Sequence, residues 1–87
     1  MTVVAEALEE LKQIQNKLEQ AKDPITLWGT VADLAIVLDK MKKEPSCQKY
    51  DLGNLLNILS GFVMGYCLRQ RLINSIRVII SEIEQSL

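Results

Sequence analysis

Apolar residues recur at intervals of three and four along almost the whole chain, and this spacing constrains the fold more than any other feature. A stripe with this spacing places one apolar face along an α-helix. The first stripe comprises Val4, Ala7, Leu8, Leu11, Ile14, Leu18 and Ala21. Most charged residues of this segment lie outside the stripe, so residues 2–22 are predicted to form an amphipathic helix.

The segment Lys22-Asp23-Pro24 interrupts the pattern and starts a second helix. Asp23 suits the N-cap, and Pro24 suits the first turn, where the missing N–H costs nothing. We expect this helix to run from about Pro24 to Lys43. Its main apolar face comprises Leu27, Trp28, Val31, Leu34, Ala35, Leu38 and Met41. This face is widened by Ile25, Ala32, Ile36 and Val37. We therefore expect the helix to be buried on more than one side.

A third helix follows residues 44–50, which contain the second proline and show no apolar period. Asp51 is suited to cap this helix. Its stripe comprises Leu52, Leu55, Leu56, Leu59, Phe62, Val63 and Tyr66. Within it, Gly61 and Gly65 have the GxxxG spacing that lets two helices approach closely. In a membrane span this spacing would indicate dimerisation, whereas in a bundle it predicts a close crossing with a neighbouring helix.

The last stripe comprises Ile76, Ile79, Ile80, Ile83 and Leu87. It could continue the third helix into one helix of about 35 residues, but so small a domain has nothing for such a long rod to pack against. We therefore expect a break between Arg71 and Asn74. In this interpretation Asn74 caps the fourth helix, and Ile73 packs against Val78 as a hydrophobic staple.

Four amphipathic helices joined by short links predict an all-α fold, an antiparallel up-down four-helix bundle. The length of 87 residues is that of a single domain, covering residues 1–87. Glycine and proline, at four and two residues, are too scarce for the many turns of a small all-β fold.

Composition argues against an enzyme. The chain contains no histidine, which excludes a histidine-based triad, acid–base pair or metal site. Two cysteines cannot supply a four-cysteine zinc site. We therefore expect no catalytic residues, no metal and no cofactor. A net charge of −1 also argues against nucleic acid as a partner.

The sequence predicts a cytoplasmic protein without a membrane span. Its N-terminal residues become acidic at once and lack the pattern of a signal peptide. The most apolar stretch, residues 52–68, contains two asparagines and a serine and falls short of the ~20 apolar residues that a span needs. In the cytosol both cysteines would stay reduced. Cys67 is expected to be a small buried hydrophobe, whereas Cys47, near Lys43 and Lys49, could be more reactive.

The net charge conceals a regional pattern. Residues 1–39 carry −4, residues 40–77 carry +5 and residues 78–87 carry −2. In an up-down bundle the arginines Arg69 and Arg71 lie at the end opposite the lysines Lys40, Lys42 and Lys43, which divides the basic region in two. One interpretation is that these residues complement the negative ends of helix dipoles. The other is a weak attraction to an anionic membrane surface or an acidic partner.

The run Tyr50-Asp51-Leu52-Gly53-Asn54-Leu55-Leu56-Asn57-Ile58-Leu59 resembles the start of the third helix in the enterocin A immunity protein family. The Lys22-Asp23-Pro24 link and the Arg71-Leu72-Ile73-Asn74 segment are similar to that family's junctions, and the resemblance extends from about Leu8 to Ile83. It implies a small cytosolic four-helix bundle that protects a bacteriocin producer from its own class IIa peptide. It also implies a protein partner, the mannose phosphotransferase permease, at the inner membrane face. The candidate contact residues are Lys42, Lys43, Arg69, Arg71 and Arg77.

A second interpretation is a small helical interaction module, such as a chaperone, a phage-encoded inhibitor or a regulatory subunit, that acts as an oligomer. The surplus of apolar positions in the second helix favours it, because a monomeric bundle needs only one stripe per helix. The sequence leaves open a monomer or a small homo-oligomer.

Overall fold

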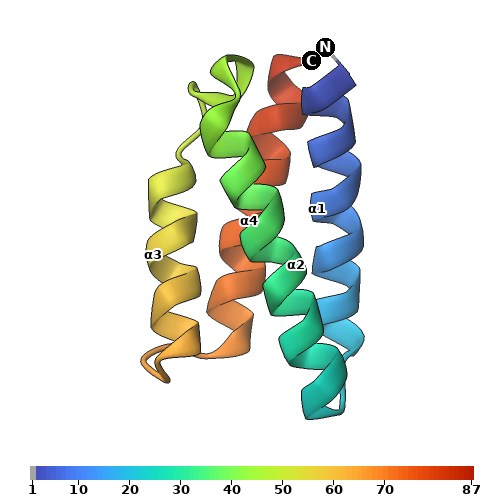
Figure 1. The fold of residues 1–87 in the computed structure, drawn as a ribbon, viewed down its shortest axis with the longest axis vertical. Helices are drawn as coiled ribbons and strands as arrows, with labels where there is room; N and C mark the ends of the chain where they lie inside the picture. The colour runs from blue at the N-terminus through green and yellow to red at the C-terminus, as the bar shows by residue number, and fades with distance from the viewer. Residues whose placement is uncertain (1) are drawn as a thin grey trace.

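Four helices make up the fold in the computed structural model, which describes residues 2–87 (Figure 1). In chain order the elements are α1 (Thr2–Gln20), α2 (Pro24–Lys43), the short 3₁₀ helix η1 (Pro45–Cys47), α3 (Leu52–Val63) and α4 (Arg69–Ser86). Successive helices run in opposite directions, with the α1–α2 and α3–α4 links at one end of the molecule and the chain termini at the other. The predicted all-α four-helix bundle is confirmed.

Each helix packs against two neighbours, because α1 and α3 both contact α2 and α4. The buried side chains between them form one hydrophobic cluster, to which all four helices and η1 contribute. Its fully buried members include Leu11 of α1, Leu34 of α2, Leu55 of α3 and Ile76 of α4. These residues lie on the apolar stripes identified in the sequence. The stripes therefore position the helices around a common core.

The start of α2 and the start of α3 agree with the prediction, because both are fixed by local capping. The Asp23 carboxylate accepts a hydrogen bond from the Thr26 backbone N–H at 2.8 Å, and Pro24 is the first helical residue. The Asp51 carboxylate accepts one from the Asn54 N–H at 3.2 Å. The Thr26 N–H lowers the pKa of Asp23 below its ordinary value of 3.8. This cap therefore stabilises the fold above that pH and weakens as the pH falls through the lowered pKa.

The predicted break between Arg71 and Asn74 is wrong, because α3 ends at Val63 and α4 already begins at Arg69. The N-cap of α4 is Leu68, and Asn74 lies inside the helix, where its side chain accepts a hydrogen bond from Gln70. The helix ends early because Gly65 adopts a φ of 85°, the left-handed conformation that ends many helices. The two helices are therefore separate.

The bonds around Gly65 form a Schellman motif. The Tyr66 N–H donates to the Gly61 carbonyl at 2.7 Å, and the Gly65 N–H donates to the Phe62 carbonyl at 3.1 Å. The predicted close helix crossing at Gly61 and Gly65 is therefore wrong. Gly65 lies outside the helix, and the nearest atom to a Cβ at Gly61 would be the Cys67 Sγ at 3.4 Å, in the turn that follows. The glycine pair marks the end of a helix.

The expectation that α2 is buried on more than one side is also wrong. Its buried residues form one stripe, Thr30, Val31, Leu34, Val37, Leu38 and Met41. Ile25 and Ile36 are exposed to 87% and 55%, and Trp28, Ala32 and Ala35 are also exposed. The physical reason is that α2 packs on α1, α3 and the short η1, and no further helix among the described residues covers its outer side. This leaves an apolar outer face on α2.

Candidate functional site

The five basic residues predicted to contact a partner do not form one site. Lys42 and Lys43 lie in the last turn of α2, at the end of the molecule that holds the chain termini. Arg69 and Arg71 lie in the first turn of α4, at the opposite end beside the two helix links (Figure 1). This separation agrees with the up-down topology. The structure thus provides two basic regions.

The Arg69 side chain forms two hydrogen bonds within the protein. Its Nη1 donates to the carbonyls of Leu18 at 3.0 Å and Ala21 at 2.6 Å, at the C-terminal end of α1. The last carbonyls of a helix have no partner within the helix, and a positive charge there also complements the helix dipole. Arg69 therefore ties the start of α4 to the end of α1. One interpretation of the basic residues was that they complement helix dipoles. Arg69 does so, but for the neighbouring helix α1.

The other four basic candidates differ in whether they form a salt bridge with an acidic residue. The Arg77 Nη2 forms a salt bridge with the Glu19 Oε2 at 2.6 Å, and the Lys43 Nζ forms one with the Asp39 Oδ2 at 3.1 Å. Among the described residues, the third salt bridge joins Lys12 to Glu84, so Arg71 and Lys42 have no acidic partner. Both are exposed. Arg71 and Lys42 are thus the candidates whose charge is fully available.

Exposed apolar residues occur at the end of the molecule that carries the helix links, and we call them the loop-end patch: Val63, Met64, Tyr66 and Leu68 at the α3–α4 link and Ile25 in the first turn of α2. Trp28 and Phe62 adjoin it, with their ring centroids 5.6 Å apart, and they join the first turns of α2 to the end of α3. The sequence interpretation missed this surface, because it placed Val63 and Tyr66 on a buried stripe. Gly65 was the signal that the stripe ends before Tyr66.

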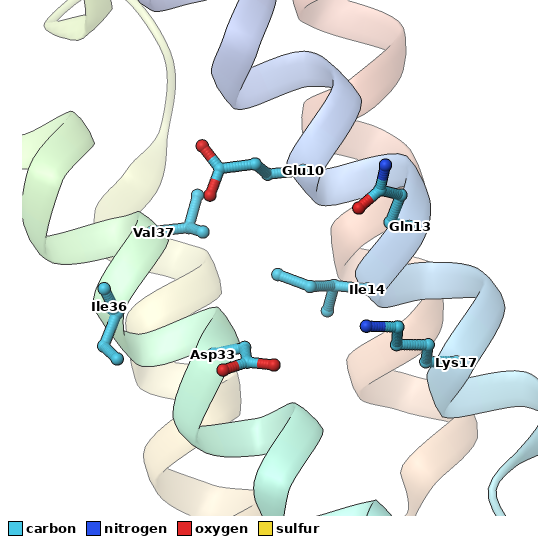
Figure 2. Close-up of a pocket in the computed structure, with 7 residues that line it drawn as sticks. All are labelled: Glu10, Gln13, Ile14, Lys17, Asp33, Ile36 and Val37. Atoms are coloured by element: carbon cyan, nitrogen blue, oxygen red, sulfur yellow. The ribbon is translucent and has the colours of Figure 1, made fainter.

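A shallow hollow lies between α1 and α2 (Figure 2). Its lining residues are Glu10, Gln13, Ile14, Lys17, Asp33, Ile36 and Val37. Ile14 and Val37 are buried and form its apolar floor, while Glu10, Lys17 and Asp33 supply two carboxylates and an amine. The lining contains no thiol, hydroxyl or imidazole that would serve as a nucleophile. We therefore assign no reaction to it.

The expected reactivity of Cys47 is not supported by its surroundings. Cys47 is the last residue of η1, its side chain is fully buried, and burial raises the pKa of the thiol. Lys49 lowers that pKa, as the sequence suggested, but less strongly than burial raises it. Cys67 is half-buried rather than buried, and its Sγ lies 3.4 Å from the Ile58 carbonyl oxygen. Both cysteines are free, and Cys47 serves as a core residue.

Two further observations concern metal ions and membranes. Within residues 2–87, no three histidine, cysteine, aspartate or glutamate side chains are placed together to hold a metal ion. Over the same residues, no helix has the length and apolar character needed to cross a membrane.

Comparison of the chain with protein-family models, curated proteins and solved structures finds no match. The functional argument therefore depends on the residues and their arrangement.

Proposed function

We propose that this protein is a non-enzymatic, protein-binding helical bundle that acts as a bacteriocin immunity protein and protects its producer against a class IIa bacteriocin. One observation carries the proposal. The run of residues 51–59, which resembles the start of helix three in the enterocin A immunity protein family, begins α3 at its Asp51 cap within an antiparallel four-helix bundle. Sequence and architecture therefore agree at the position where the resemblance is most distinctive.

In this proposal the protein works in the cytoplasm and contacts a permease component at the inner membrane face. Of the five basic candidates, Lys42 and Arg71 are exposed without an acidic partner among the described residues, and Lys43 is exposed and pairs with Asp39 of its own helix. Arg69 and Arg77 are instead engaged with α1. We therefore assign the partner contact to Lys42 and Lys43 at one end or to Arg71 at the other. Long-range attraction from such charges favours an acidic surface on the partner.

Expression in a bacteriocin-sensitive strain tests the proposal. We expect the protein to protect the cells against at least one class IIa bacteriocin of a panel, measured as survival at increasing peptide concentration. Either Arg71→Glu or the pair Lys42→Glu and Lys43→Glu should abolish protection, because each reverses exposed charge at one end only. Immunoblotting and thermal melts of each variant check that the protein is present and folded. Unchanged killing by every peptide would refute the proposal.

The alternative function is a small helical interaction module, such as a chaperone, a phage-encoded inhibitor or a regulatory subunit, that acts as an oligomer. The outer face of α2 favours it, because Ile25, Trp28, Ala32 and Ile36 recur at helical spacing and are exposed. A helix with an uncovered apolar stripe can bury it against a partner helix.

Light scattering tests this alternative directly. If α2 forms the oligomer interface, the wild-type protein should have at least twice the monomer mass, and Ile36→Glu should return it to the monomer. Val78→Glu changes an equally exposed residue of α4 and should leave the mass unchanged. A monomeric wild-type protein at high concentration would exclude the oligomer.

A further inference from the structure

The end of the bundle that carries the helix links presents its apolar side chains outward. In the loop-end patch, Ile25, Tyr66 and Leu68 are exposed to 87%, 81% and 80%, and Met64 is exposed to 65%. Both helix links lie at this end of the molecule (Figure 1), and most of the surface of these four side chains is in contact with water. Leaving several large apolar groups together in water is unfavourable, and such patches commonly mark interaction surfaces.

The composition of this end is that of a membrane–water interface. Tyrosine and tryptophan, which have an apolar ring and one polar group, are enriched at the level of lipid headgroups. Here Tyr66 belongs to the patch and Trp28 adjoins it. The remaining members are aliphatic side chains or methionine, which suit the boundary between headgroups and acyl chains.

The same end is positively charged. Residues 17–33 and 57–77, which include both links, contain five basic and three acidic residues, a net +2, whereas the rest of the chain carries −3. Within the described residues, Lys22 and Arg71 have no acidic partner, although the structure pairs Arg77 with Glu19. The bundle is thus polarised, with its apolar patch at the positive end.

The positive charges at this end favour one kind of binding partner for the patch over the others. A symmetric dimer through this end would bring Lys22 and Arg71 of one copy toward the same residues of the other, and like charges oppose such an interface. An anionic surface is attracted by them instead. A lipid surface also accommodates protruding side chains without a matching pocket, whereas a protein partner must provide one.

We propose that the link-bearing end of this protein docks on an anionic lipid surface. Ile25, Met64, Tyr66 and Leu68 enter the boundary between headgroups and acyl chains, and Lys22 and Arg71 contact lipid phosphates. This interaction lies on the surface and needs no spanning helix. It goes beyond the proposed immunity function, which concerns a protein partner and shares only Arg71 with this surface.

Vesicle binding by the purified full chain tests the inference, with the single tryptophan as the probe. We expect vesicles of equal parts phosphatidylcholine and phosphatidylglycerol to shift Trp28 emission to shorter wavelength and to sediment the protein. Vesicles of phosphatidylcholine alone should do neither, and added salt should weaken the binding.

Two double variants separate the apolar and the charged contributions. Tyr66→Ser with Leu68→Ser should lower the partition coefficient by about tenfold or more, because two protruding apolar side chains are lost. The fold should persist, since both side chains are exposed and serine is a favourable N-cap at position 68. Lys22→Gln with Arg71→Gln should lower binding by about tenfold.

Val78→Ser serves as the matched control, because Val78 is apolar and half-exposed but lies outside the patch. It should bind vesicles like the wild type. The inference is overturned by a lack of binding to anionic vesicles, by equal binding to neutral ones, or by binding that the patch variant leaves unchanged. Dimerisation that the patch variant abolishes would overturn it in favour of a second copy. No bacteriocin or permease is present, so failure here leaves the immunity proposal standing.

Discussion

Replacement of Arg69 by methionine is expected to lower the free energy of unfolding by about 2–3 kcal/mol. The guanidinium donates to the carbonyls of Leu18 and Ala21, where α1 ends and no intrahelical donor remains. Methionine retains most of the aliphatic stem but cannot donate a hydrogen bond. The variant therefore leaves two part-buried carbonyls without this partner and removes a positive charge from the negative end of α1.

Urea denaturation and thermal melting measure this effect. For a domain of this size a loss of 2–3 kcal/mol corresponds to a fall in Tm of about 10 °C or more. Arg71→Met is the matched control, because Arg71 lies two residues away, is exposed and has no ion-pair partner in the described chain. It should change stability by less than about 0.5 kcal/mol. Equal losses in the two variants would contradict the assigned role of Arg69.

This comparison also bears on the search for partner contacts. A loss of protection caused by an Arg69 substitution would arise from the weakened α1–α4 junction, whether or not that residue touches a partner. Arg71 offers the same charge in the same turn without that structural role. A functional loss in Arg71→Met, with stability retained, would therefore report on binding.

The starts of α2 and α3 and the buried faces of α1 and α4, which depend on neighbouring residues, were predictable from the sequence. The start of α2 depends on Asp23 and Pro24, and the start of α3 depends on Asp51, each within three residues of the group it caps. The apolar stripes of α1 and α4 likewise identify their buried faces, because helical spacing alone fixes which residues share a face. Together these local signals were sufficient for the helix count and the topology.

Features that depend on distant residues were not predictable in this way. The bonds from Arg69 to α1 join residues 48 and 51 positions apart, and no local pattern indicates them. Whether Ile25 and Ile36 are buried depends on how many helices surround α2, which its own sequence does not specify. The loop-end patch was missed for a local reason instead, since the apolar period continues through Tyr66 although α3 ends at Val63 and Gly65 terminates it.

Gly65→Val is expected to lower the free energy of unfolding by about 2 kcal/mol, because the residue has a φ of 85°. A side chain in this left-handed conformation brings its Cβ close to the following carbonyl oxygen, and β-branching aggravates the clash. No other atom lies within 4 Å of a Cβ placed at Gly65, so backbone conformation alone carries the cost. Relief of the strain would break the Schellman bonds to Gly61 and Phe62.

Gly29→Ala provides a control of opposite sign. Gly29 lies within α2, its φ is not positive, and a Cβ there meets no atom within 4 Å. Alanine at that position should raise the free energy of unfolding by about 1 kcal/mol, because glycine is the poorer helix former. Urea denaturation of both variants measures the two effects on one scale.

Asn74→Ala completes the test of where α3 and α4 separate. If the break were near Asn74, as the sequence first indicated, loss of that cap would cost about 1 kcal/mol and Gly65→Val would be a mild substitution within a helix. With the break at Gly65, Asn74 is an exposed residue inside α4, so its replacement changes stability by less than about 0.5 kcal/mol. The stability losses of Asn74→Ala and Gly65→Val, compared with each other, therefore show whether the turn lies near Asn74 or at Gly65. The lipid-docking end depends on a turn at Gly65, because that turn exposes Tyr66 and Leu68.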